Sequence, residues 1–344
     1  MTATTLERAP HPVRGSRSRA TGLALGLLPA AGLLALVLGL GVAVGSKSVA
    51  LGDVWAALVA PDDSFEAAVV ASRIPRTLLG LLVGASLAVA GAVIQGLTRN
   101  PLGDPGLLGV NAGASMSVVL ATALLGAGVG RTVWAAIPGA VLAAVVVYVV
   151  GSGPAGATPV RLILAGAAVT AALVALVQGL SLALPEVFDS LRFWSIGSLA
   201  GRGEAVGQVG WFVLAGLLVC FAMARALNAV ELGDEAATSL GLSPGRTKVL
   251  AAAGATVLCA AAVAAAGPIG FVGLATPHVV RSFTGADHRW LLPYCAVLGP
   301  VLVIGSDVIG RVVARPGELM VGAVTAFVGA PFLIAAVRRG RVGL

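Results

Sequence analysis

The sequence predicts an all-α polytopic membrane protein with about ten transmembrane helices, and three observations lead to this fold class. The chain has a mean hydropathy of +0.99, with 58 % hydrophobic and only 11 % charged residues, which excludes an ordinary water-soluble domain. Apolar runs of about 20 residues recur along it, and this length crosses a bilayer as a helix. The 47 glycines allow helices to approach closely in lipid but would weaken a soluble helix bundle.

The apolar runs give the expected helices in order along the chain. Most runs are bounded by charged residues, glycine or proline, which is typical of the ends of spans. The eighth is short and contains two prolines and a histidine. We expect spans near 23–45, 74–97, 107–127, 132–150, 160–184, 206–226, 246–266, 270–284, 289–308 and 318–337.

The first 22 residues are basic and polar, and we expect them to form a disordered cytoplasmic arm. A cleaved signal peptide is the alternative. The apolar run at 23–45 is longer than the roughly 7–15 residues of a signal-peptide core, which favours a retained first span. Residues 23–341 are then expected to form one transmembrane domain.

The distribution of charge predicts how the chain is oriented in a membrane. The net charge is +7, and its basic residues are scattered between apolar runs rather than clustered as in a nucleic-acid surface. With ten spans both termini lie on one side, and most basic residues fall on that side. The positive-inside rule therefore predicts cytoplasmic N and C termini, and the scattered charge predicts no nucleic-acid partner.

The stretch ELGDEAATSLGLSP (231–244) is unusually acidic for this chain and predicts a short helix at about 233–241 on the cytoplasmic side. We expect Asp234 to cap this helix, Glu235 to lie in its first turn and Gly241 to end it, while small apolar residues give it a narrow face. Ser243 and Pro244 are then expected to cap and begin the next span. Such a surface helix fits a groove on a soluble partner. An ordinary loop with one helical turn is the alternative. The residues concerned are Asp234, Glu235, Ala236, Ala237, Leu240 and Gly241.

Two stretches resemble each other and predict an inverted internal repeat. NPLGDPGLL (100–108) follows the second expected span, and GPIGFVGLA (267–275) follows the seventh. Five spans separate them, so they would face opposite sides of the membrane. Inverted repeats recur in transporters, with interrupted helices near the pathway.

Few polar groups are available for transport chemistry inside the expected spans. Thr170, Gln178 and Ser181 make the fifth span mildly polar, as either a pathway lining or helix–helix hydrogen bonding would require. Asp307 is the one carboxylate in a span, near its end. No phosphate-binding loop is present, so ATP-driven transport would need a separate ATPase chain. Three isolated cysteines and three scattered histidines predict no metal site.

Long motifs resemble the permeases of iron-siderophore and cobalamin ABC importers, the FecCD-type family. The resemblance covers roughly residues 22–341 and its blocks occur in family order. They are SRIPRTLLGLLVGASLAVAGAVIQGLTRNPLGDPGLLGVNAGA (72–114), FWSIGSLAG (193–201), LGDEAATSLGLSPGRTK (232–248), GPIGFVGLATPHVVRSFTGADHRWLLP (267–293) and GELMVGAVTAFVGAPFLI (317–334).

The resemblance implies a type II ABC importer permease fold and a set of partners. Two permease subunits, as a homodimer or with a sister permease, would form the pathway along their shared axis, lined largely by the fifth span. Two ABC ATPase subunits would bind ATP and magnesium, so this chain would bind no cofactor itself. An extracytoplasmic binding protein would deliver the substrate.

The same resemblance assigns roles to particular residues. It makes the helix at about 233–241 the coupling helix that docks on the ATPase. It also implies that Arg73, Arg76 and Arg311 meet acidic patches on the binding protein, whereas solvated arginines at the membrane edge are the alternative.

We therefore expect a non-enzymatic permease that imports a ferric siderophore through the lipid bilayer of a bacterial plasma membrane. A cobalamin or haem importer is the alternative within the class. From other classes, an ion-coupled secondary transporter would depend on Asp307, and a structural membrane subunit would transport nothing.

Overall fold

The computed structural model describes residues 15–60, 62–126, 132–153, 156–157 and 159–338, and within them the regular secondary structure is helical apart from one two-residue antiparallel strand pair. The basic arm before residue 15 and the tail after residue 338 lie outside the described residues. The elements are α1 (Gly15–Ala43), α2 (Leu51–Val59), α3 (Phe65–Thr98), η1 (Pro105–Leu108), α4 (Val110–Leu125), α5 (Thr132–Gly151), β1 (Ser152–Gly153), β2 (Gly156–Ala157), α6 (Pro159–Ala183), α7 (Pro185–Trp194), α8 (Ala205–Glu231), α9 (Asp234–Ser239), α10 (Pro244–Ala266), α11 (Val272–Thr284), α12 (His288–Val313) and α13 (Val321–Arg338).

Every expected span corresponds to a described helix. Seven of these helices are long and apolar enough to cross a membrane by length and composition, and α4 and the first part of α13 are shorter apolar helices. The doubtful eighth span is α11, which has 13 residues. The chain is therefore an all-helical, multi-pass membrane protein, as its hydropathy predicts. Three short helices lie outside the expected spans, namely α2, α7 and α9.

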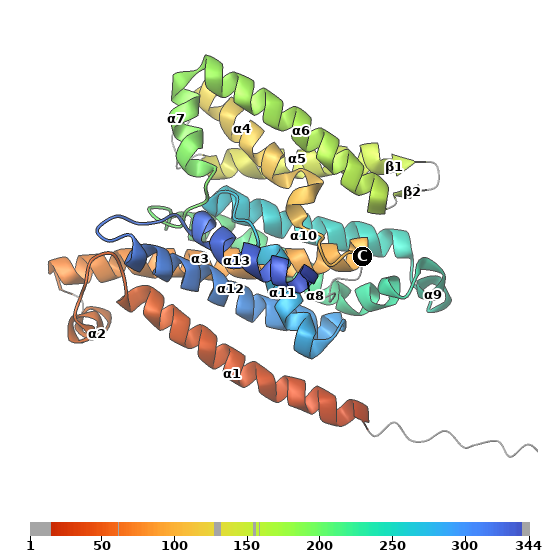
Figure 1. Cartoon of the computed structure of the whole chain (residues 1–344), viewed down its shortest axis with the longest axis horizontal. Coiled ribbons are helices and arrows are strands. Elements are labelled where there is room, and N and C mark those ends of the chain that lie inside the picture. The colour runs from red at the N-terminus through yellow and green to blue at the C-terminus, as the bar shows by residue number, and fades with distance from the viewer. Residues whose placement is uncertain (1–14, 61, 127–131, 154–155, 158, 339–344) are drawn as a thin grey trace, which may run out of the picture.

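The helices are arranged around α3 and α10, which are the most enclosed (Figure 1). The apolar window of α3 is 83 % buried, whereas that of α1 is 11 % buried, so α1 lies at the periphery. Figure 1 shows α4, α5, α6 and α7 as a group on one side of this centre and α1 on the other. The buried core is dominated by alanine, valine and glycine along α3 and α10.

Glycines bring the central helices into backbone contact. A Cβ atom on Gly84 would lie 2.5 Å from Pro300 Cα of α12, and one on Gly91 would clash with the carbonyl of Gly273 in α11. Any larger residue at either position would push two helices apart. Close approach through small residues is how helices pack where lipid supplies no hydrophobic driving force.

The two stretches that resemble each other meet in the middle of the molecule. A Cβ atom on Gly273 would lie 3.3 Å from Pro105 Cδ and 3.5 Å from Asp104 Oδ2, so the loop before α4 touches the start of α11. Gln95 Nε2 on α3 donates to the carbonyl of Gly273 at 3.1 Å. Both stretches interrupt the helical order beside the central helix, and the inverted repeat itself stays a prediction.

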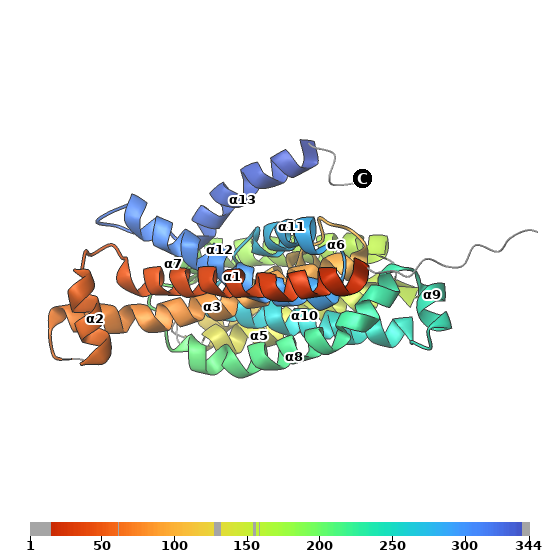
Figure 2. The ribbon, with the colours of Figure 1, turned by 90° about the horizontal axis from the view of Figure 1, so that it is seen from below.

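The two ends of the helix bundle differ in the short helices that they carry. Figures 1 and 2 place α2 at one end and α9 at the other, and α7 lies toward the α2 end in Figure 1. We call these the α2 end and the α9 end. In Figure 2, α13 projects away from the rest of the bundle.

Candidate functional site

The helix predicted at about 233–241 is present as α9, with a small difference at its start. Gly233, with φ of 121°, is the cap residue, and Asp234 is already the first helical residue instead of the cap. Asp234 and Glu235 therefore both occupy the first turn, where their charges oppose the positive end of the helix dipole.

The end of α9 follows from Gly241, as predicted. Leu242 N donates to Ala237 O at 3.0 Å and Gly241 N donates to Thr238 O at 2.9 Å, which is the Schellman arrangement. Gly241 has φ of 78°, a conformation that glycine adopts without steric cost. This tight closure turns the chain directly into α10, which begins with Pro244 after the cap residue Ser243.

The small apolar face of α9 is divided between the protein and its surroundings. Ala237 is completely buried and packs with Ala229, Val230 and Leu242. Leu240, by contrast, is 66 % exposed, and Leu232 just before α9 is also exposed. Ala237 thus fixes the helix to the end of α8, and the exposed leucines remain available for a partner.

Asp234 joins three segments through its carboxylate. Lys248 Nζ of α10 lies 2.7 Å from Asp234 Oδ2, and Arg99 Nη2 lies 3.3 Å from Asp234 Oδ1. Arg99 follows α3 and also donates to the carbonyl of Val230 at 2.7 Å. These contacts connect α9 to α10 and to the residue that follows α3.

A second polar cluster ties α8 to the start of α12 near the same end. Asn228 Nδ2 donates to Asp287 Oδ1 at 2.7 Å, and the backbone N–H of His288 donates to Asn228 Oδ1 at 2.8 Å. Asp287 also caps α12 by accepting from Arg289 N. Hydrogen bonds from the Arg289 side chain, followed by that from Asn228, lower the pKa of Asp287 to about 2.

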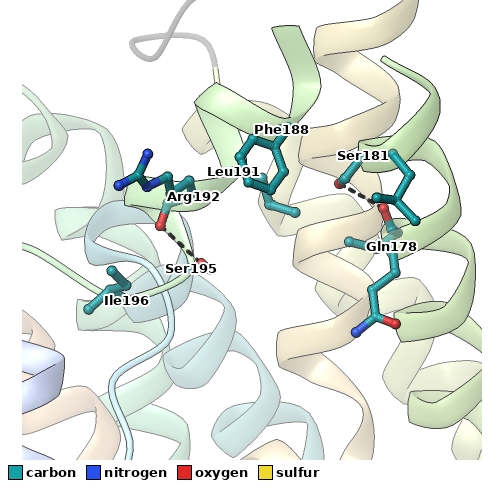
Figure 3. A pocket seen from close by; sticks show the side chains of 9 residues that line it. Gln178, Ser181, Phe188, Leu191, Arg192, Ser195 and Ile196 are labelled. Atoms are coloured by element: carbon teal, nitrogen blue, oxygen red, sulfur yellow. Dashed lines mark hydrogen bonds between the residues drawn. The ribbon is translucent and has the colours of Figure 1, made fainter. Parts of the chain in front are cut away.

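A pocket of about 530 Å³ lies between α6 and α7 toward the α2 end. Figure 3 shows Phe188 and Leu191 of α7 directed toward Gln178 and Ser181 of α6. The Ser181 hydroxyl donates to Val177 O at 2.7 Å, so it is partly occupied within its own helix. The complete lining is Val177, Gln178, Ser181, Leu182, Phe188, Leu191, Arg192, Ser195 and Ile196.

Two of the three predicted pathway residues line this pocket and the third does not. Gln178 and Ser181 lie in its wall, whereas Thr170 lies two turns earlier on α6, close to Gly109. A mostly apolar wall with a few amide and hydroxyl groups can hold a large organic molecule without binding it tightly. The pathway assignment of all three residues stays a prediction.

The predicted docking arginines lie together at the α2 end, where Arg73 and Arg311 cap α1. Arg73 donates to the carbonyls of Val42, Ala43 and Lys47, and Arg311 donates to those of Gly41 and Val44. Arg73 is 6 % and Arg311 is 1 % exposed. Cations at the carbonyl end of a helix satisfy its unpaired acceptors and its dipole. Both guanidinium groups are therefore engaged inside this chain.

Asp307 is the partner of two of these arginines. Arg76 Nη2 lies 2.7 Å from Asp307 Oδ1, and Arg311 Nη2 lies 3.0 Å from Asp307 Oδ2. Arg76 also pairs with Glu318, and the bonds from Arg76 and Ser46 hold the pKa of Glu318 below its usual value despite partial burial. A carboxylate saturated by two guanidinium groups serves to offset their buried charge.

Some residues of these sites were not identified from the sequence. The α7 face that carries Phe188 and Arg192 was missed because α7 has only 10 residues and lies between the fifth expected span and the next motif block. Their spacing of four, together with Ser195, could have indicated a helix facing one wall. The ion pairs of Lys248 and Arg99 with Asp234 had no local signal, because the partners are far apart in the chain.

The fold and these sites define a class of protein: a multi-pass membrane permease with an inter-helix pocket and a small surface helix at one end. Comparison with known proteins gives the family. The profile of the FecCD transport family matches residues 33–339, and the chain belongs to this family.

Individual relatives agree along almost the whole chain. The chain is 46 % identical to the ferric enterobactin transport system permease protein FepD of Escherichia coli K12, over 89 % of this chain and 93 % of that protein. It is 39 % identical to the Fe(3+)-citrate import system permease protein YfmD of Bacillus subtilis 168, over 88 % of this chain and 91 % of that protein. It is 34 % identical to the hemin transport system permease protein HmuU of Yersinia pestis, over 90 % of this chain and 94 % of that protein.

A solved structure has the same fold. The match to an inward-facing metal-chelate type ABC transporter has a TM-score of 0.79 at 27 % identity, covering 93 % of this chain and 98 % of that one. The chain is therefore a membrane-embedded transport permease of the ABC importer type and not an enzyme. Such a permease works with an ATPase and a binding protein.

Proposed function

We propose that this chain translocates a ferric siderophore across a bacterial plasma membrane, driven by ATP hydrolysis on a separate subunit. The observation that carries the proposal is the similarity to FepD, at 46 % identity over 89 % of this chain. Most of the similar family members are also named as transporters of ferric chelates. The pocket between α6 and α7 supports it, because its volume of about 530 Å³ and mixed wall suit a bulky organic chelate.

The pocket is the proposed segment of the pathway, with Gln178 and Ser181 in its wall and Thr170 further along the same helix. Substrate would pass along α6 at the axis between two permease subunits. The iron arrives already chelated, so the wall needs no metal ligands of its own. A homodimer and a pair of sister permeases both fit this arrangement.

Helix α9 is the proposed contact with the ATPase. Its exposed Leu240 and first-turn carboxylates would lie against the partner, while buried Ala237 and the Asp234–Lys248 pair hold it to the bundle. Two ATPase subunits would bind ATP and magnesium and displace α9 during the cycle. On this proposal α9 and both termini would lie on the cytoplasmic side.

The α2 end would then face the binding protein. Arg73, Arg76 and Arg311 are the residues proposed to attract an acidic surface of the binding protein there, and Asp307 and Glu318 offset part of their charge inside the chain. Arg76 is the most accessible of the three and is the one proposed to reach a partner directly. Electrostatic attraction of this kind mainly sets the rate and register of docking.

An ion-coupled carrier is disfavoured by the surroundings of Asp307. Its two oxygens are held by the guanidinium groups of Arg76 and Arg311 at 2.7 and 3.0 Å, so neither oxygen is open to a transported cation. Cobalamin and haem remain alternative substrates because relatives named for both occur, including the cobalamin permease BtuC of Halobacterium salinarum at 41 % identity.

The test is uptake by cells that lack this chain, supplied with labelled ferric siderophores, cobalamin or haem. Loss of uptake of one ferric siderophore, restored by the wild-type gene, supports the proposal. Loss of cobalamin or haem uptake instead would keep the transport mechanism and overturn the substrate. A Gln178→Trp variant should block uptake while the ATPase remains associated, which would place the pocket in the pathway.

A further inference from the structure

A second groove, at the α9 end, shares no lining residue with the pocket between α6 and α7. It has a volume of about 470 Å³ and lies between the end of α3, the second half of α5 and the first half of α10. Its walls are almost wholly apolar, with Leu97, Val145, Leu162, Val249 and Val257 among them. Val145 and Val249 are each about half exposed, so the groove is open on one side of the chain.

The end of the groove nearest α9 is polar and basic. Lys248 and Asp234 lie in its lining, and Arg99 lies against the same carboxylate, which leaves one positive charge in excess. Tyr148 is 41 % exposed in the wall, and tyrosine is enriched where the hydrocarbon of a bilayer meets its headgroups. The groove thus changes from apolar to basic over a short length, as the bilayer interface does.

The surroundings of the groove decide what fills it. α3, α5 and α10 are all candidate membrane spans, so an open apolar groove along them lies at the depth of acyl chains. A phospholipid matches both the apolar walls and the basic end of the groove. Its acyl chain would lie along the valines and leucines, and its headgroup would lie at the basic end. A lysine at that end favours an anionic headgroup, because each basic residue near the surface contributes to such binding.

We propose that this groove is a binding site for an anionic phospholipid, whose acyl chain lies between α5 and α10 and whose phosphate is held by Lys248. The phosphate competes with Asp234 for the same ammonium group. Lipid binding therefore loosens the 2.7 Å Asp234–Lys248 contact that fixes the first turn of α9 to α10. Through this contact the lipid composition of one leaflet influences the mobility of α9.

The effect on α9 rests on the coupling role proposed above, whereas occupation of the groove does not. The first measurement is therefore lipid retention. The purified chain is equilibrated with phosphatidylglycerol or phosphatidylcholine in detergent, and bound lipid is counted by native mass spectrometry. Wild type should retain phosphatidylglycerol in preference, and Lys248→Gln should lower this preference about fivefold, the effect of one basic residue.

Two variants separate lipid binding from loss of the ion pair. Asp234→Asn and Lys248→Gln both break the pair, but Asp234→Asn frees the lysine and should raise retention of phosphatidylglycerol. Arg246→Gln is the matched control, because Arg246 is exposed on the same turn of α10 and does not line the groove. The site would be overturned if Arg246→Gln and Lys248→Gln lost phosphatidylglycerol retention equally. It would also be overturned if Asp234→Asn lost retention in parallel with Lys248→Gln.

A bulky side chain placed inside the groove tests whether a lipid occupies it. Ala253 is exposed and lines the groove, whereas Leu250 is exposed on the same helix outside it. Ala253→Phe should reduce retention of phosphatidylglycerol, and Leu250→Phe should not. If Ala253→Phe instead lowers the fraction of permease dimer and leaves lipid retention unchanged, the groove receives a second subunit and the lipid proposal is wrong.

The consequence for transport is measured separately. The ratio of uptake to ATP hydrolysis is measured in vesicles with phosphatidylglycerol and in vesicles of phosphatidylcholine alone. The ratio should differ between the two lipid compositions for the wild-type transporter and should be the same in both for Lys248→Gln. Retained lipid with an unchanged ratio would keep the site and overturn its influence on α9. Failure of all substrate uptake with normal lipid retention would overturn the proposed function alone.

Discussion

Arg76 and Asp307 form an ion pair of 2.7 Å between α3 and α12, and the side chain of Asp307 is only 2 % exposed. The two residues are 231 positions apart in the chain. Their pairing, extended by Arg311, neutralises the carboxylate on which an ion-coupled transporter was expected to depend. The same contact holds the end of the bundle that is proposed to face the binding protein.

Asp307→Asn should destabilise the protein by about 3–5 kcal/mol, because Arg76 and Arg311 lose their shared counter-charge in a buried site. The measurement is thermal unfolding in detergent, together with the amount of protein in the membrane. An ion-coupled carrier would instead give a normally folded Asp307→Asn protein without transport. A normal melting temperature with no uptake would therefore contradict the structural role.

Arg73→Gln should weaken the fold more than it weakens docking. Its guanidinium group donates to the carbonyls of Val42, Ala43 and Lys47, which glutamine cannot replace together. Each buried acceptor left without a donor costs about 1–3 kcal/mol. Arg76→Gln is the comparison, since Arg76 is the more accessible side chain. The affinity for the binding protein and the melting temperature are measured for both variants. Arg73→Gln should lower the melting temperature more than it lowers the affinity.

Leu240→Asp should uncouple ATP hydrolysis from uptake without unfolding the chain. Leu240 is 66 % exposed, so a carboxylate there has no burial cost in the isolated protein but would disturb a docked apolar contact. Uptake and ATPase activity of the reconstituted transporter are measured together. Ser239→Asp adds the same charge at the neighbouring exposed position and should have the smaller effect. Unchanged uptake in Leu240→Asp would remove Leu240 from the coupling surface.

Gly91→Ala should be severely destabilising. Its added methyl group would meet the carbonyl of Gly273, and backbone cannot move aside as a flexible side chain can. Overpacking of a close helix contact costs about 1–3 kcal/mol or more. The control is Gly210→Ala in α8, where a Cβ would meet nothing within 4 Å. Similar melting temperatures for the two alanine variants would show that α3 and α11 are not in contact in the membrane.

Stability should fall as the pH drops below about 4 through the titration of Asp287. The pKa of Asp287 is about 2 in the folded chain, below the roughly 3.9 of an unfolded aspartate. A lowered pKa contributes stability that is present above pH 4 and is lost as the pH falls toward 2. Asp287→Asn retains a capping amide and should be less sensitive to pH in this range. Parallel pH profiles of unfolding for wild type and Asp287→Asn would contradict the assignment.

The sequence could predict much of the fold because membrane helices are specified locally. A run of about 20 apolar residues must satisfy its own backbone hydrogen bonds in lipid, so length and hydropathy alone locate the spans. Helix ends are also specified locally, so Gly241 and Ser243-Pro244 correctly indicated where α9 ends and α10 begins. The eighth span was the uncertain one because proline and polar residues weaken the local signal of α11.

Other features were decided only by the tertiary structure, because they depend on residues that are far apart in the chain. The arginines at 73 and 311 look like surface charges in sequence, but the end of α1 packs against them and takes their hydrogen bonds. Ala237 and Leu240 look like one apolar face, but α8 covers only the first. Local pattern determines that a helix forms, whereas which of its sides is covered depends on neighbours that no local pattern specifies.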